Sequence, residues 1–240
     1  MPRWKNAEIT QIKDLGPTTK SFTLNILEEE VFSFRAGQFI TFDLDIAEKR
    51  LDRWRSYSIA SAPSKDNTIE LCIVKLEGGR ASTYLFDQIK QGDTLKLKGP
   101  GGAFYLPDTI TNKLVFICTG TGLAPFRSML LDLDKKGDLD REVHLIFGTR
   151  KEEGILYRKE LEALQEKYPK FRYDICLSRS PEWPSYKGYV HQVYEQVYTD
   201  NFADTSFLLC GWSHMVDEAR KKLEEEMGVP KAQIFYELYG

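Results

Sequence analysis

An apolar segment that runs directly into a glycine turn is the feature that most constrains this chain. Leu114–Cys118 has the pattern of a buried strand, the next residues read Thr-Gly-Thr-Gly, and a helix-like stretch follows at Pro125–Lys136. Such a turn brings a phosphate group close to backbone amides, which favour an anion at a helix start. Pro125 stands where a third glycine would complete the dinucleotide fingerprint, so the turn either binds a phosphate or simply connects strand and helix.

The residues after Pro107 alternate apolar strands with longer amphipathic segments, and this predicts a parallel sheet covered by helices on both faces. The expected strands are Leu114–Cys118, Val143–Phe147, Tyr173–Leu177 and Phe207–Cys210. The expected helices are Pro125–Lys136, Tyr157–Tyr168, Tyr189–Val197 and Met215–Met227.

The residues before Pro107 have a different pattern, in which short alternating segments are separated by Gly, Pro, Asn and Asp. This pattern is typical of an antiparallel barrel or sandwich. One helix is expected at Ser82–Lys90, with Ser82 as its N-cap. The 240 residues are enough for two domains, and the change of pattern predicts them at residues 1–107 and 108–240.

Charge and composition exclude several classes of partner. The charges behind the net value of -3 are spread along the whole chain, which argues against nucleic acid as a partner. No apolar run has the length of a signal peptide or a membrane span, so we expect a cytoplasmic protein without a membrane segment. The 4 cysteines are far apart and the chain has 3 histidines, so no metal centre or iron–sulfur cluster is expected.

Two short motifs in the first half carry groups suited to a dinucleotide. In Arg55–Ser58, strand alternation places Arg55 and Tyr57 on one face and the serines on the other. A guanidinium can clamp a pyrophosphate, a tyrosine ring can stack on a heterocycle, and a serine hydroxyl can bond a ring nitrogen. The segment Gly79–Ser82 offers a second phosphate site at a helix start. An ordinary surface strand and a plain N-cap are the alternatives.

Taken in chain order, four motifs resemble those of the ferredoxin-NADP reductase family. The matches are Arg-x-Tyr-Ser at Arg55, Tyr57 and Ser58, Gly-x-x-Ser at Gly79 and Ser82, Gly-Thr-Gly-x-Ala-Pro at Gly120–Pro125, and Cys-Gly at Cys210 and Gly211. The resemblance spans nearly the whole chain. It implies a six-stranded antiparallel FAD-binding barrel, followed by a five-stranded parallel α/β domain that binds a nicotinamide dinucleotide.

The resemblance also implies roles for individual residues. Arg55 would hold the FAD pyrophosphate, Tyr57 would stack on the isoalloxazine, and Ser58 would hydrogen-bond near the flavin N5. Cys210, with Gly211 beside it, would lie close to the nicotinamide ring, where hydride passes. The further implied cofactor-binding residues are Ile73, Lys75, Gly79, Arg80, Ala81 and Ser82 for FAD, and Gly120, Thr121, Gly122 and Pro125 for the nicotinamide dinucleotide.

The end of the chain adds another match. Glu237-Leu238-Tyr239 resembles the Glu-x-Tyr ending of plant-type members, in which the aromatic ring covers the flavin and moves aside for nicotinamide. Here Gly240 follows the tyrosine. The resemblance implies that Tyr239 stacks on the flavin and that Glu237 exchanges a proton with it. A tyrosine buried at a strand end and a solvated carboxylate are the alternatives.

The choice between NADPH and NADH depends on the segment after the third strand of the second half. Ser178 and Arg179, followed by Lys187 and Tyr189, look like the NADP-binding set of the family, and neither 178 nor 179 is acidic. The surrounding Pro-Glu-Trp and Gly-Tyr-Val sequences also look like those of NADH-using relatives. We expect NADPH as the electron donor, with NADH as the alternative.

The expected function is that of an FAD-dependent oxidoreductase, which accepts hydride from the nicotinamide at flavin N5 and passes electrons to a separate acceptor. The acceptor is expected to be a ferredoxin, a flavodoxin or an oxygenase component, with a free flavin or a ferric chelate as alternatives. An acidic protein acceptor would need a basic rim, for which Lys49, Arg50, Arg53 and Arg80 are candidates; a solvated loop is the alternative. A non-catalytic or regulatory electron-transfer subunit of a larger complex, or a nucleotide-binding sensor, remains an alternative function.

Overall fold

The computed structural model describes residues 3–107, 111–199, 202 and 204–239. By its contacts the chain divides into two compact units, one of Met1–Tyr105 with Ala124–Asp132 and the other of Leu106–Leu123 with Leu133–Gly240. The domain boundary expected after residue 107 falls on residues 108–110, which lie outside the described residues.

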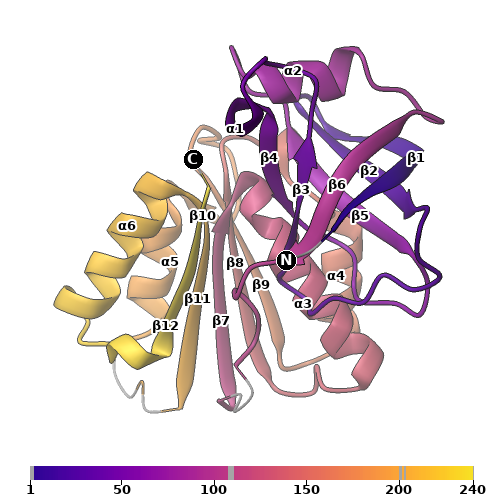
Figure 1. Cartoon of the computed structure of the whole chain (residues 1–240). Helices are drawn as coiled ribbons and strands as arrows, with labels where there is room; N and C mark the ends of the chain where they lie inside the picture. Colours follow the sequence, from indigo (N-terminus) through magenta and orange to yellow (C-terminus); the bar gives the residue numbers. More distant parts are fainter. Residues whose placement is uncertain (1–2, 108–110, 200–201, 203, 240) are drawn as a thin grey trace. The chain divides into compact units, whose positions relative to one another are not determined.

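The first unit is built on an antiparallel sheet of six strands, in the order β4-β3-β6-β1-β2-β5. The strands are β1 (Trp4–Gly16), β2 (Thr19–Ile26), β3 (Phe39–Asp43), β4 (Trp54–Ser58), β5 (Thr68–Val74) and β6 (Thr94–Gly101). Just after β4, Ile59 pairs with Leu71 of β5, so the two edge strands meet and the sheet closes into a barrel (Figure 1). The expected six-stranded antiparallel architecture is confirmed.

The barrel encloses apolar side chains because its strands alternate apolar and polar residues. On β2, Phe22, Leu24 and Ile26 are almost completely buried, and the residues between them are partly exposed. Burial of one such side chain contributes about 1.5–3 kcal/mol to folding. Two short helices accompany the strands, α1 (Arg50–Arg53) before β4 and α2 (Arg80–Asp87), which directs Ala81 and Leu85 into this core.

Helix α2 begins two residues before the expected start, and Ser82 is not its N-cap. Gly79 occupies the N-cap position, and its carbonyl accepts a hydrogen bond from the Thr83 amide at 2.9 Å. The Ser82 hydroxyl accepts a hydrogen bond from the Leu76 amide at 3.0 Å and donates one to the Gly79 carbonyl at 3.1 Å. Ser82 therefore ties the turn before the helix together, which the capping pattern did not predict.

The middle of helix α3 (Leu123–Lys136) belongs with the barrel by its contacts. The Arg127 guanidinium donates a hydrogen bond to the Ala60 carbonyl at 2.8 Å and lies 3.4 Å from the Glu70 carboxylate. The Ser128 hydroxyl donates a hydrogen bond to the Ser61 carbonyl at 2.6 Å. Helix α3 therefore supplies hydrogen-bond donors for two backbone carbonyls in the segment that follows β4.

The second unit contains a parallel sheet in the order β10-β9-β8-β7-β11-β12. The strands are β7 (Lys113–Thr119), β8 (Glu142–Thr149), β9 (Phe171–Leu177), β10 (Tyr186–Lys187), β11 (Thr205–Trp212) and β12 (Ile234–Tyr239). The remaining helices are α4 (Arg158–Lys167), α5 (Val190–Val197) and α6 (Ser213–Lys221), which continues as a π-helix at Lys222–Glu226; 3₁₀ turns occupy Gly120–Gly122, Glu152–Gly154 and Lys231–Gln233. Helices α5 and α6 lie on one face of the sheet and α4 on the other (Figure 1).

The parallel α/β architecture is confirmed, with one strand more than the five expected. The additional strand, β10, consists of two residues that pair with Cys176 and Leu177 at the edge of the sheet. A strand this short has no periodicity for a sequence pattern to reveal. Strand order reverses at β7, which lies between β8 and β11, and open parallel sheets bind ligands at the carboxyl ends of their strands at such a point.

Candidate active site

The turns that follow β7 and β11 touch each other at the reversal of strand order. An added Cβ at Gly122 would lie 2.6 Å from the Cys210 carbonyl carbon and 2.7 Å from the Gly211 Cα, and closer still to the Cys210 carbonyl oxygen. Gly120 has a φ of +53° and Gly211 a φ of +146°, conformations that side chains rarely adopt. The Thr-Gly-Thr-Gly and Cys-Gly motifs thus form a single site at the carboxyl ends of two neighbouring strands.

Thr119 contributes a polar group to this site that sequence reasoning missed. Its hydroxyl oxygen is buried and has no hydrogen-bond partner within the described residues. An added Cβ at Gly211 would lie 2.7 Å from that oxygen, so the hydroxyl stands directly beside the Cys-Gly turn. Buried polar groups are nearly always satisfied, so this hydroxyl beside the Cys-Gly turn is a candidate partner for a polar ligand atom. The residues present therefore fit a nicotinamide dinucleotide.

Cys210 is completely buried and stands in register with Cys118 on one side and Glu237 on the other. Burial raises the pKa of the Cys210 thiol well above its usual value, and the Glu237 charge raises it further against a hydrogen bond with Tyr239. The thiol is therefore protonated at neutral pH and unsuited to nucleophilic attack. The neutral Cys210 thiol is a small, polarizable group against which a planar ring can pack.

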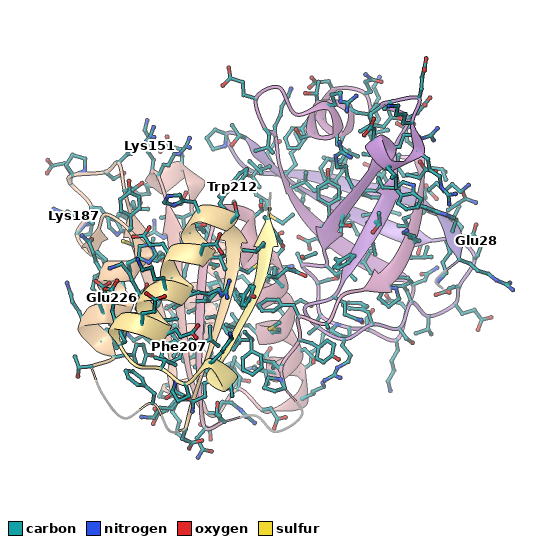
Figure 2. The ribbon with its side chains drawn as sticks, turned by 60° about the vertical axis from the view of Figure 1, so that its left-hand side comes forward. Glu28, Lys151, Lys187, Phe207, Trp212 and Glu226 are labelled. Carbon is teal, nitrogen blue, oxygen red and sulfur yellow. The ribbon has the colours of Figure 1, made fainter. Side chains whose placement is uncertain are left out.

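Strand β12 places the two candidate residues from the chain's end beside Cys210. Glu237 pairs with Cys210 and Tyr239 with Trp212, so both side chains lie on the Cys210 face of the sheet. Both residues are half-buried. Figure 2 labels Trp212 near the upper end of β11 and Phe207 near the lower end, which shows that this group is at the carboxyl end of the strands.

A cluster of cations lies at the carboxyl ends of β8, β9 and β10. The Arg179 amide donates a hydrogen bond to the Arg150 carbonyl at 2.8 Å, and Lys187 is in register with the last residue of β9, immediately before Ser178. Arg150, Arg179 and Lys187 are exposed, and none has an ion-pair partner in the part of the chain that the structure describes. Figure 2 shows Lys187 on the outer surface of the unit. Tyr189, at 70% exposure, is the N-cap of α5.

Arg150 was not among the residues expected from the sequence. It follows β8 directly, and its position beside Arg179 depends on the pairing of β8 with β9. Many other cations of the second unit are neutralised, such as Arg158 by Glu152 at 2.7 Å. The unpaired cations therefore make this corner a favourable place for an anionic group.

In the first unit, Arg55 and Tyr57 share one face of β4, as the alternation predicts, and the structure turns this face toward the barrel core. They pair with the buried Phe42 and Ile40 of β3, and the Tyr57 ring lies 5.8 Å from the Phe42 ring. Burial raises the pKa of Tyr57 to about 12, against the opposing charge of Arg55, so the phenol stays neutral. Ser58 is buried at the end of the same strand.

Two sets of hydrogen-bond donors in the barrel fit a pyrophosphate. Arg55 uses Nη1 to donate to the carbonyls of Asp52 and Trp54, at 3.0 and 2.7 Å, and its other N–H groups have no acceptor among the described residues. The backbone amides of Arg80, Ala81 and Ser82, which form the first turn of α2, also have no acceptor among the described residues. No side chain caps this helix start, which leaves its positive end available to an anion. The barrel therefore fits FAD.

Ile73 and Lys75 are less favourably placed for a cofactor. The Ile73 side chain is buried in the barrel core, which leaves its backbone for contacts. The Lys75 ammonium lies 2.6 Å from the Asp87 carboxylate, so its charge is already neutralised. Lys75 also lines a cleft of about 330 Å³ between the turn after β1, the turn after β5 and helix α2.

The candidate basic rim is only partly available. Arg53 is paired with Asp43 at 2.8 Å, whereas Lys49, Arg50 and Arg80 are exposed and without an ion-pair partner among the described residues. Arg50 stacks on the Trp54 ring at 4.8 Å, and Lys98 lies over the same ring at 3.7 Å. The Trp4 ring packs 5.5 Å from that of Trp54. Cations on indole faces therefore extend the basic surface along β4 and β6.

In the described ranges, no group of three or more His, Cys, Asp or Glu side chains is arranged to hold a metal ion. Across those same ranges, no helix combines the length and apolar character needed to cross a membrane.

Comparison with known proteins identifies both halves of the chain. Residues 6–105 match the family of oxidoreductase FAD-binding domains, and residues 116–221 match the family of oxidoreductase NAD-binding domains. The chain therefore contains an FAD-binding and a NAD-binding domain.

The chain matches some similar proteins over nearly their whole length and others over only part of it. The chain is 33% identical to ferredoxin-NADP reductase B of Sorangium cellulosum, over 97% of the chain and 96% of that protein. It is 36% identical to the phenol hydroxylase P5 protein of Acinetobacter pittii, over 89% of the chain but 59% of that protein. A ferredoxin-NADP reductase structure from Neisseria gonorrhoeae, with bound FAD and NADP, is 27% identical, with a TM-score of 0.78 and 99% of both chains covered.

Proposed function

Because the chain belongs to the ferredoxin-NADP reductase family of flavin oxidoreductases, we propose that it takes hydride from NADPH and passes electrons to a separate protein acceptor. When bound, FAD supplies the hydride-accepting N5 and the ability to release electrons one at a time. The observation that carries the proposal is the contact between the glycine turn after β7 and the Cys-Gly turn after β11, beside the orphaned Thr119 hydroxyl.

In the first unit, this chain's residues bind and orient the flavin. Arg55 and the free amides of Arg80–Ser82 hold the pyrophosphate, with Gly79 keeping the turn narrow. Tyr57, fixed against Phe42, presents its ring to the isoalloxazine, and Ser58 donates or accepts a hydrogen bond near N5. The neutralised Lys75 and the buried Ile73 line the adenosine end of the cofactor rather than carry its charge.

In the second unit, the residues at the reversal point position the nicotinamide. Gly120, Thr121 and Gly122 let the dinucleotide approach the backbone, and Pro125 lies in the first turn of the helix that receives the phosphates. Cys210 and Gly211 form the floor of the ring site. Glu237 and Tyr239, on the same face, hold a proton and cover the site until nicotinamide enters.

Selection of NADPH is assigned to the unpaired cations. The 2′-phosphate that distinguishes NADPH from NADH needs positive charge, and Arg150, Arg179 and Lys187 supply it with no carboxylate paired to them among the described residues. Ser178 adds a hydroxyl, and the exposed ring of Tyr189 is available to stack on adenine.

The electron acceptor is proposed to be an acidic protein such as a ferredoxin, a flavodoxin or an oxygenase component. The exposed cations Lys49, Arg50 and Arg80 provide the charge. Lys98 adds a further cation over the Trp54 ring, and that ring provides apolar area. Charge complementarity of this kind raises association rates and makes them fall with ionic strength.

The test is anaerobic mixing of the FAD-loaded protein with NADPH or NADH, followed by the loss of flavin absorbance. We expect NADPH to reduce the flavin faster, and Arg179→Ala to weaken NADPH binding by about tenfold while NADH is unaffected. Lys231→Ala, an exposed lysine elsewhere in the second unit, is the matched control. Faster reduction by NADH would overturn the cofactor assignment alone, and absence of reduction by either would overturn the proposed reductase.

A further inference from the structure

A chain of hydrogen bonds crosses the face of the second unit's sheet that α5 covers. The Tyr186 hydroxyl accepts a hydrogen bond from Arg172 Nη2 at 2.9 Å, and the same nitrogen lies 2.6 Å from Asp174 Oδ2. That carboxylate oxygen is 2.9 Å from His144 Nε2, and His144 Nδ1 is 2.8 Å from the Tyr198 hydroxyl. The chain therefore runs without a break from β10 to the residue that follows α5.

The centre of this network is shielded from water. The side chains of His144 and Asp174 are 5% and 15% exposed. Burial lowers the pKa of His144 despite the neighbouring Asp174, so the ring is neutral at physiological pH. When the neutral ring donates its Nε2–H to Asp174, its Nδ1 accepts a hydrogen bond from the Tyr198 hydroxyl, so both ring nitrogens are satisfied. Hydrogen bonds in such surroundings are strong and costly to leave incomplete.

The two ends of the network enclose one segment of the chain, residues 186–198. This segment consists of β10, Gly188, Tyr189 and α5, and it carries the candidate cofactor residues Lys187 and Tyr189. Its β10 end is held to β9 by two register pairs and, outside the strand ladder, by a hydrogen bond from the Gly188 amide to the Leu177 carbonyl at 2.9 Å. Its α5 end packs by Val193 and Tyr194 into the apolar cluster on the sheet. Gly188 has a φ of +100°, so the backbone here is held in a conformation open mainly to glycine.

The rings at the two ends also pack on the sheet's core. Tyr186 and Tyr198 contact the apolar cluster under α5, and the Tyr198 ring lies 5.6 Å from Phe207 in an edge-on arrangement. Their hydroxyls, in contrast, meet no other partner than the network among the described residues. Apolar packing alone allows the Tyr186 and Tyr198 rings to shift along the sheet. The hydrogen bonds of their hydroxyls fix the position of each ring.

We propose that this network is a positioning device for the nucleotide: it fixes both ends of residues 186–198, so that Lys187 and Tyr189 stand ready for the adenosine end of the dinucleotide. His144 and Asp174 are thus positioning residues, which act on the ligand through β10 and α5. This inference rests on the proposed function for its ligand, but the restraint on the segment is a property of the protein alone.

The test uses the FAD-loaded protein and two conservative variants, Tyr186→Phe and Tyr198→Phe, which remove one hydroxyl from either end and keep the packed ring. Tyr173→Phe is the matched control, because Tyr173 is a buried tyrosine of β9 whose hydroxyl has no hydrogen-bond partner in the described structure. We expect each end variant to raise the dissociation constant of NADP⁺ about three- to tenfold, with kcat and flavin content unchanged and the control at the wild-type value.

Hydrogen exchange of the peptide that spans residues 186–192 provides a readout without nucleotide. We expect faster hydrogen exchange of the Gly188 amide in Tyr198→Phe, although residue 198 lies at the far end of the network. Exchange that is unchanged in both end variants, or equal in the Tyr173→Phe control, would overturn the restraint. Faster exchange with unchanged NADP⁺ affinity would overturn its role in binding. A wild-type protein that binds neither nucleotide would instead refute the proposed function, and exchange alone would then decide on the restraint.

Discussion

Replacing Gly122 with alanine isolates the contact between the two turns of the nucleotide site. Gly122 has a φ of -60°, which any residue adopts, so the substitution adds no backbone strain of its own. Its new methyl group would lie 2.6–2.7 Å from backbone atoms of Cys210 and Gly211. Backbone in the middle of a parallel sheet cannot swing aside as a flexible side chain does. We therefore expect the overpacking to lower the free energy of unfolding by about 1–3 kcal/mol. We also expect it to push the two turns of the nucleotide site apart.

Denaturant unfolding of the FAD-loaded variant measures the first effect, and titration with NADP⁺ measures the second. A shift of one turn by about 1 Å is expected to weaken nucleotide binding or slow hydride transfer by about 10- to 100-fold, with FAD retained. Gly137→Ala is the control: Gly137 has a φ of +72° and no atom within 4 Å of its added Cβ, so it reports backbone strain without a clash. Wild-type stability and wild-type NADP⁺ affinity in Gly122→Ala would refute the reasoning.

Three further outcomes follow from the same structure. Arg55→Ala should weaken FAD binding by about 10- to 100-fold, because it removes charge-assisted donors, and the flavin content of the purified protein checks this. Cys210→Ala should slow hydride transfer at saturating NADPH by about tenfold and leave bound FAD unchanged, as single-turnover reduction will show. The folded-state pKa of His144 is lowered from 6.5, so the stability that depends on its neutral form is present above pH 6.5 and is lost as pH falls through the folded pKa. Unfolding measured from about pH 7 to about pH 5 should therefore show a decline that His144→Gln reduces; an equal decline in both proteins contradicts this assignment.

The sequence was sufficient wherever a local pattern determines structure. Alternation on β4 predicted that Arg55 and Tyr57 share one face of the strand, because successive side chains of a strand point to opposite faces. The apolar run before the glycine turn likewise predicted β7 and helix α3 to within two residues. The N-cap assignment of Ser82 was wrong because its hydroxyl bonds to the turn behind it, and capping preference alone does not distinguish the two partners.

What the sequence left out depends on neighbours that are distant along the chain. Arg150 belongs to the candidate site because the parallel pairing of β8 and β9 brings it beside Arg179, which lies 29 positions later in the chain. Thr119 is notable because its buried hydroxyl has no hydrogen-bond partner among the residues that the structure describes, which only the folded structure shows. His144 and Tyr198 are 54 positions apart, and neither belongs to a motif. Pairings of this kind follow from topology, and no local pattern encodes them.

The contacts of α3 with the barrel have a consequence for how the protein is made. During synthesis the six barrel strands leave the ribosome well before residues 127 and 128, which supply the donors for the carbonyls of Ala60 and Ser61. Until then the carbonyls of Ala60 and Ser61 lack these two donors. These two hydrogen bonds of the barrel therefore form only after part of helix α3 has been synthesised. A fragment that ends at residue 107 lacks both donors.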